Sequence, residues 1–114
     1  MSAHLRPLAW TPEEFLDWER QQELRYEFDG VGPVAMTGGT LRHSDIASLI
    51  DVALRQRLRR PCRAFRGDVK VRVATNRYRY PDAVVSCSEP LPEDSDILPD
   101  PVVVFEVLSP STGP

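Results

Sequence analysis

The 114-residue sequence has two cysteines, a single lysine and no long apolar run. No stretch approaches the roughly 20 apolar residues that a membrane-spanning helix needs, and the N-terminus lacks the apolar centre of a signal peptide. Cys62 and Cys87 are too few and too far apart for a metal cluster or a disulfide framework. These absences predict a cytoplasmic protein without membrane contact, in which both cysteines are free, buried or half-buried thiols.

The lone lysine, Lys70, stands beside thirteen arginines. A GC-rich genome is the simplest explanation of such a bias, and it makes a lysine at this position more notable. Charge is also unevenly distributed: residues 1–54 carry −5, residues 55–79 carry +9, and residues 80–114 carry −7. A basic block between acidic ones fits a phosphate-binding face beside an acidic metal site. The alternative is a solvated helix face with charged strand edges.

Hydrophobic periodicity predicts two helices. Thr11-Pro12-Glu13-Glu14 has the N-cap, first-turn proline and capping-box glutamate of a helix that continues to about Gln22. Apolar residues at helical spacing predict the second helix from Leu41 to Leu58.

Alternating or continuous apolar residues predict the strands, which we place at 24–28, 31–36, 63–66, 68–73, 80–85 and 102–108. An acidic, proline-rich loop separates the last two. We therefore expect an α/β fold in which a mixed sheet is flanked by the two helices. Residues 1–10 are expected to form a leader, and residues 11–114 a single domain.

Two carboxylates stand in segments that are predicted to be buried strands. Asp82 follows Pro81 at the mouth of one strand, and Glu106 follows four apolar residues in the other. A buried ionised carboxylate is unfavourable unless it is paired or binds a metal. Two of them on neighbouring strands suggest a shared divalent cation. The alternative is that each forms an ion pair with one of the arginines.

These segments carry a family resemblance. Pro81-Asp82 and Glu106-Val107-Leu108 with the following Ser109-Pro110-Ser111-Thr112 resemble the Uma-two-like restriction endonucleases, a branch of the PD-(D/E)XK nuclease superfamily. The resemblance runs from about Thr11 to Thr112. Its other matches are Arg25-Tyr26-Glu27 with Asp29-Gly30, Arg42-His43-Ser44 and Asp68-Val69-Lys70-Val71. It implies a restriction-endonuclease-like core and hydrolysis of DNA with Mg²⁺ or Mn²⁺ as cofactor.

The resemblance also implies a set of site residues. Asp82 and Glu106 would bind the metal, with the backbone carbonyl of Val107 as a further ligand and Glu27 as a third acidic residue. As a bare residue, Glu27 reads as a solvent-facing strand carboxylate. The superfamily has a lysine two residues after the second acid, where this chain has Leu108. Lys70 is therefore the candidate catalytic lysine.

In the resembling family the lysine comes from a helix that follows the Ser-Pro-Ser-Thr segment, and this sequence ends before such a helix. The expected core is therefore incomplete at its C-terminus, and a homodimer could cover the exposed sheet. The chain would then be an endonuclease, or a nucleic-acid-binding or structural remnant without catalysis.

The basic block and the start of the second helix supply the candidate DNA contacts. Free backbone N–H groups at a helix start favour an anion, although His43 could equally be a surface or capping residue. The candidate nucleic-acid-binding residues are Arg42, His43, Arg63, Arg66, Arg72, Arg77 and Arg79.

Overall fold

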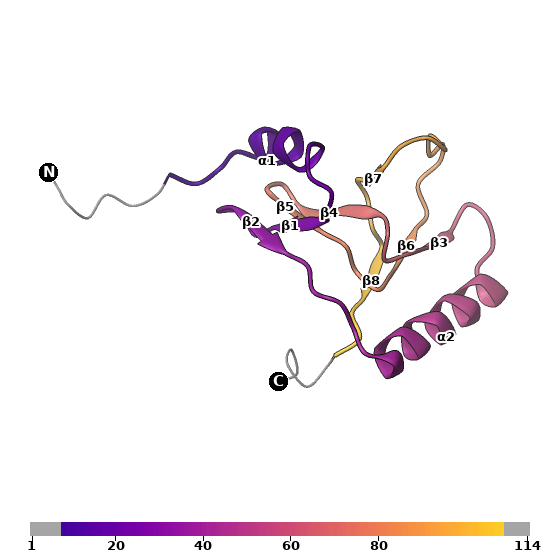
Figure 1. Ribbon diagram of the computed structural model, residues 1–114. Coiled ribbons are helices and arrows are strands. Elements are labelled where there is room, and N and C mark those ends of the chain that lie inside the picture. The colour runs from indigo at the N-terminus through magenta and orange to yellow at the C-terminus, as the bar shows by residue number, and fades with distance from the viewer. Residues whose placement is uncertain (1–7, 109–114) are drawn as a thin grey trace, which may run out of the picture.

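The computed structural model describes residues 8–108, which form two helices and eight short strands (Figure 1). The predicted leader therefore lies largely outside the described residues, as do Ser109 to Thr112. In chain order the elements are α1 (Pro12–Glu19), β1 (Tyr26–Phe28), β2 (Pro33–Ala35), α2 (Leu41–Arg57), β3 (Arg63–Arg66), β4 (Lys70–Ala74), β5 (Arg77–Arg79), β6 (Ala83–Ser86), β7 (Ile97–Leu98) and β8 (Val103–Phe105).

The strands form two sheets rather than the single mixed sheet that was expected. The first has the order β2-β1-β5-β4-β7, and the second has the order β3-β6-β8. All pairs are antiparallel except the parallel pair of β4 and β7, so the first sheet is mixed. Helix α1 packs against β1, and α2 packs against β3 and β6, at opposite ends of the molecule (Figure 1). The predicted α/β class is confirmed.

Helix α1 begins as its sequence predicts. The Thr11 side chain accepts a hydrogen bond from the Glu14 amide, and the Glu14 carboxylate accepts one from the Thr11 amide. This capping box satisfies two backbone donors that no helical carbonyl can reach. The buried face of α1 then places Phe15 against Phe28 and Tyr78, with ring centroids 5.0 and 6.1 Å away. That aromatic cluster fixes α1 to the first sheet.

A second core cluster lies where the two sheets meet, with Val71, Val84 and Leu98 at its centre. Strand β6 is buried throughout, as predicted. Strand β8 is not: Val103 and Val104 are 43% and 37% exposed, because β8 lies at the edge of its sheet in the described structure. The predicted apolar side of α2 is also partly exposed, since Leu49 is 64% exposed.

The cysteines form a disulfide, so the expectation of two free thiols is wrong. Strands β3 and β6 are antiparallel, with Arg63 opposite Ser86. This register places the preceding Cys62 opposite the following Cys87. Their separation of 25 positions gave no hint of the pairing, because only the strand register brings them together. A disulfide is uncommon in a reducing compartment, so the cytoplasmic location stays a prediction.

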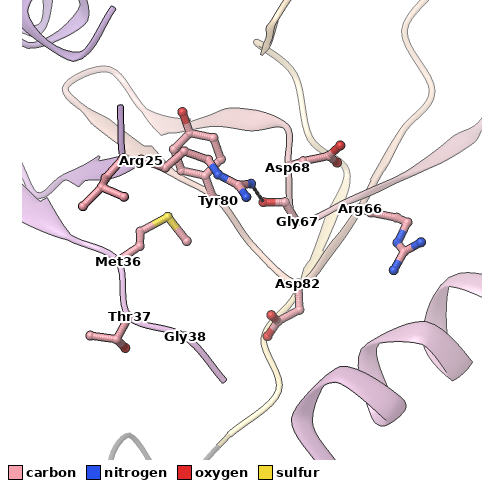
Figure 2. A pocket seen from close by; sticks show the side chains of 10 residues that line it. Arg25, Met36, Thr37, Gly38, Arg66, Gly67, Asp68, Tyr80 and Asp82 are labelled. Carbon is pink, nitrogen blue, oxygen red and sulfur yellow. Dashed lines mark hydrogen bonds between the residues drawn. The ribbon is translucent and has the colours of Figure 1, made fainter. Parts of the chain in front are cut away.

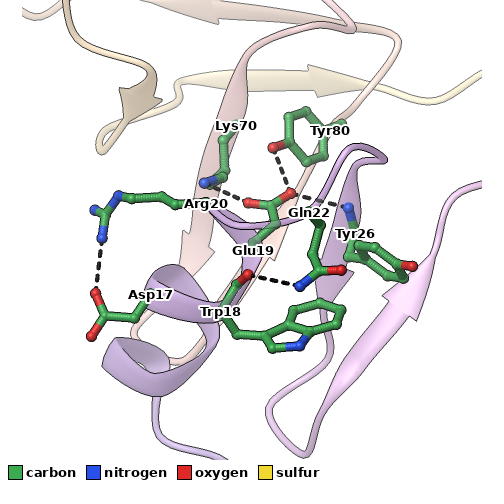
Figure 3. Close-up of polar contacts among 8 residues, drawn as sticks. All are labelled: Asp17, Trp18, Glu19, Arg20, Gln22, Tyr26, Lys70 and Tyr80. Carbon is green, nitrogen blue, oxygen red and sulfur yellow. Dashed lines mark hydrogen bonds and ion pairs between the residues drawn. The ribbon is translucent and has the colours of Figure 1, made fainter.

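A buried polar network joins α1 to β1, to β4 and to Tyr80, which follows β5 (Figure 3). Lys70 Nζ lies 2.6 Å from Glu19 Oε1, and both side chains are almost completely buried. Glu19 Oε2 also accepts hydrogen bonds from the Tyr80 hydroxyl at 2.8 Å and the Tyr26 amide at 3.0 Å. Burial and the adjacent Glu19 carboxylate raise the pKa of Tyr80 well above its ordinary value, so its hydroxyl remains a donor. Every charge in the network therefore has a partner.

Among the described residues, neither helix combines the length and apolar composition needed to cross a membrane.

Candidate functional site

Five acidic or basic side chains, which lie on or next to five different elements, meet at a cavity of about 720 Å³. Glu27 comes from β1, His43 from the first turn of α2, Arg79 from the end of β5, and Asp82 from the residue before β6. Glu106 follows directly after β8. The loop from Met36 to Thr40 lines one side of the cavity, where a Cβ atom at Gly38 would meet nothing within 4 Å but one at Gly39 would lie 3.0 Å from His43 Nδ1.

The pairing of β6 with β8 brings the two central carboxylates together. In this antiparallel pair Ala83 lies opposite Phe105, so the residues just outside it, Asp82 and Glu106, lie opposite each other. The prediction that their strands are neighbours is therefore confirmed. Glu106 is less buried than expected, with 36% of its side chain exposed.

The two contacts of Asp82 fall on one oxygen atom. Its Oδ2 accepts a hydrogen bond from the Val107 amide at 2.6 Å and lies 3.1 Å from His43 Nε2. Residues 8–108 offer no hydrogen bond to Oδ1, which leaves that oxygen for a ligand. The contact with His43 was not predicted; the only signal was Thr40, whose side chain caps α2 at the His43 amide.

Arg79 lies between the other two carboxylates. Its Nη2 is 3.0 Å from Glu106 Oε2, and its Nε is 3.7 Å from Glu27 Oε2. Glu27 Oε2 also accepts a hydrogen bond from the Tyr80 amide at 2.9 Å. The sequence placed Arg79 among the DNA contacts and did not predict this bridging position. The Arg79 side chain is half exposed, so solvent reaches it.

Burial and the charges around the cavity shift the pKa of Glu106. Burial raises the pKa of this carboxyl, the Arg79 guanidinium opposes that shift, and the negative charges of Asp82 and Glu27 add to it. Three carboxylates near one another favour a cation between them. As they stand, the described residues hold no group of three acidic, histidine or cysteine side chains arranged to chelate a metal. Arg79 supplies positive charge instead.

Lys70 does not line this cavity, and its buried pairing with Glu19 gives it a structural role. Strand alternation places Lys70 and Arg72 on one face of β4. On that face Lys70 is buried against Glu19 of α1 and does not reach a charged cleft. Val107 does line the cavity, where its amide contacts Asp82.

The residues predicted to contact DNA do not form one surface around the cavity. Arg63 pairs with Glu93 of the acidic loop at 2.9 Å, and the arginine holds the pKa of that carboxyl below its usual value. Arg72 and Arg77 lie on β4 and β5, and Arg42 is exposed at the start of α2. Only His43 and Arg79 of the predicted set line the cavity with Asp82. Arg66 lines a second cavity next to it.

Replacing Glu106 with glutamine is expected to stabilise the metal-free protein slightly at neutral pH. Since its pKa is raised above the ordinary value of 4.5, the folded state binds this proton more tightly than the unfolded state. The stability that this provides is complete below that value and is lost as pH rises through the raised pKa. The glutamine should therefore increase the melting temperature at pH 7 by about 1–3 °C after solvent screening. The gain should vanish near pH 4.

Thermal unfolding of the wild type and the Glu106→Gln protein at both pH values measures this difference. Glu89→Gln, at an exposed loop position, is the matched control and should change the melting temperature at neither pH. A Glu106→Gln protein that melts lower than wild type at pH 7 would mean that the ion pair with Arg79 outweighs the cost of burial.

Comparison with known proteins identifies the family. The model of the Uma2 family, described as "Putative restriction endonuclease", matches residues 12–113. The "Uncharacterized protein slr1290" of Synechocystis sp. (strain ATCC 27184 / PCC 6803 / Kazusa) is 33% identical over 104 residues, which are 90% of this chain and 55% of that protein. The chain thus spans about half the length of this relative. No solved structure shows a significant match. Since the family model covers most of the sequence, the chain belongs to the Uma2 family.

Proposed function

We propose that the cavity around Asp82 and Glu106 binds Mg²⁺ or Mn²⁺ and that the protein is an endonuclease that hydrolyses phosphodiester bonds in DNA. The observation that carries the proposal is the meeting of Glu27, Asp82 and Glu106 at one cavity, although they lie in or next to three separate strands. Membership of a family described as "Putative restriction endonuclease" supports the same chemistry.

The donor set fits a hard divalent cation. Mg²⁺ binds oxygen ligands and keeps several waters, so one or two protein carboxylates are enough to hold it. Asp82 would contribute its Oδ1 and Glu106 its carboxylate, while Glu27 and the Val107 carbonyl are the further donors. When bound, such a cation neutralises charge on the phosphate and activates water.

The chain's own residues prepare the site for this cation. The Val107 amide and His43 hold Asp82 in one orientation. Arg79 occupies the region between Glu27 and Glu106 and would be released when the cation enters. A released guanidinium beside the cavity is well suited to contact a phosphate of the substrate.

A second candidate is a nucleic-acid-binding protein without catalysis. The observation that favours it is the position of Lys70, which is committed to Glu19 in the core. The residue two positions after Glu106, where the superfamily has its lysine, is Leu108. In this case DNA would bind, but neither Mg²⁺ nor Mn²⁺ would produce cleavage.

Conversion of supercoiled plasmid to open circles separates the two candidates. The endonuclease requires that the purified chain nicks the plasmid with Mg²⁺ or Mn²⁺ and that excess EDTA abolishes nicking. Binding without nicking under either metal would support the second candidate. Equal nicking in EDTA and in Mg²⁺ would instead indicate a contaminating nuclease.

A further inference from the structure

A second cavity, of about 610 Å³, lies on the other side of Asp82 (Figure 2). It is open and largely polar, and the two cavities are adjacent, since both are lined by Met36, Thr37, Gly38, Tyr80 and Asp82. A strand of nucleic acid that crosses the proposed metal site can therefore extend into this second cavity. The residues found only in the second cavity are Leu24, Arg25, Arg66, Gly67 and Asp68.

Strand pairing fixes Arg66 next to Asp82. Arg66 ends β3 and lies opposite Ala83, the residue after Asp82. The next residue, Gly67, lies beside the same segment: a Cβ atom at this position would be in van der Waals contact with the Pro81 carbonyl oxygen at 3.4 Å and the Asp82 Cα atom at 3.9 Å. Arg66 is exposed, and its side chain forms no ion pair or hydrogen bond within residues 8–108. The Arg66 guanidinium can therefore pair with an anion.

Arg25 occupies the other side of Gly67 in Figure 2. Its Nη1 donates a hydrogen bond to the Gly67 carbonyl at 3.2 Å, and its guanidinium lies 5.6 Å from the centroid of the Tyr80 ring. These two contacts orient Arg25 and leave its other N–H groups for a ligand. Two arginines thus line the cavity, Arg25 with its guanidinium held in place and Arg66 without a partner among the described residues.

The charge of the cavity depends on Asp82. Arg25 and Arg66 are balanced by Asp68 and Asp82 when both acids are ionised. Neutralising Asp82, as a bound divalent cation would, leaves an excess of positive charge. The second cavity then attracts an anion, whereas it is neutral while the metal site is empty.

We propose that this second cavity binds the backbone phosphate adjacent to the one at Asp82, with Arg66 as the principal contact and Arg25 as the second. The inference rests on the proposed nuclease site, because Asp82 connects the two cavities. It assigns the ligand as a phosphodiester of a polynucleotide strand and makes binding there stronger when Asp82 is uncharged.

Salt-dependent DNA binding by the Asp82→Asn protein in EDTA tests the proposal without needing cleavage or metal. The asparagine removes the charge of Asp82 in the way that a cation would. Adding Arg66→Gln should weaken binding of a duplex oligonucleotide about threefold at low salt, and should lower the slope of log affinity against log salt by about 0.9, the value for one phosphate. Arg66→Lys should retain the slope because it keeps the charge.

Arg59→Gln in the same background is the matched control. It removes one exposed arginine just after α2, outside both cavities, and should leave the slope unchanged. An unchanged slope in Arg66→Gln, an equal decrease in Arg59→Gln, or an absence of DNA binding by the Asp82→Asn protein would each overturn the proposal. A reduced slope specific to Arg66 supports it even if the wild type nicks no plasmid, in which case only the nuclease proposal fails.

Discussion

The Asp82→Asn protein is expected to fold normally and to lose plasmid nicking by about 100-fold or more. An asparagine can keep the geometry, because its carbonyl oxygen can take the place of Oδ2 and accept from the Val107 amide and His43. Its amide group then takes the place of Oδ1. That group cannot bind a cation, so the substitution removes the metal ligand and little else. Asp82→Ala is less informative, since it would leave the Val107 amide unpaired.

Asp94→Asn provides the matched control for this experiment. It makes the same chemical change at an exposed position of the acidic loop, which we do not expect to take part in catalysis. Nicking rates with Mg²⁺ and melting temperatures should be measured for all three proteins. Equal nicking by wild type and Asp82→Asn would remove the support for an endonuclease centred on this carboxylate.

The Lys70→Met protein is expected to lose roughly 3–5 kcal/mol of stability, because removing one partner leaves the buried charge of Glu19 uncompensated. In a domain of this size the loss should lower the melting temperature by more than about 10 °C. Combining Lys70→Met with Glu19→Gln should recover much of it. The glutamine carries no charge but still accepts from the Tyr80 hydroxyl and the Tyr26 amide.

Arg20→Met serves as the control, because it removes an exposed cation from the end of α1 whose ion pair with Asp17 is open to solvent. It should change stability by less than about 0.5 kcal/mol. The measurement also tests the expectation that Lys70, the single lysine of the sequence, replaces the catalytic lysine of the family. A Lys70→Met protein that keeps its melting temperature and loses nicking would show that the lysine acts in catalysis.

Local sequence signals predicted most of the secondary structure. Thr11 and Glu14 define the start of α1 through contacts within one helical turn, and both helices lie close to their expected ranges. The strands that carry Asp82 and Glu106 also pair as expected, because two apolar runs joined by a long loop can lie side by side. The helix starts are decided by contacts between neighbouring residues, and the strands are marked by their apolar runs.

Partners from distant segments could not be predicted in this way. Tyr80 and Glu19 are 61 positions apart, and only tertiary packing shows that Glu19 receives both Tyr80 and Lys70. The Cys62–Cys87 disulfide depends on the register of β3 and β6 for the same reason. His43 illustrates a further limit. A histidine at a helix start has several plausible partners, and only the fold shows that its partner is Asp82.

The position of Tyr80 has a consequence for variation far from the cavities. Its hydroxyl is tethered to Glu19 of α1, its amide donates to Glu27, and two residues later the chain reaches Asp82. A substitution that shifts α1 would therefore displace the segment carrying the proposed metal ligand, although α1 itself contributes nothing to either cavity. Natural or engineered changes on that helix can therefore alter the geometry of the proposed metal site through the backbone alone.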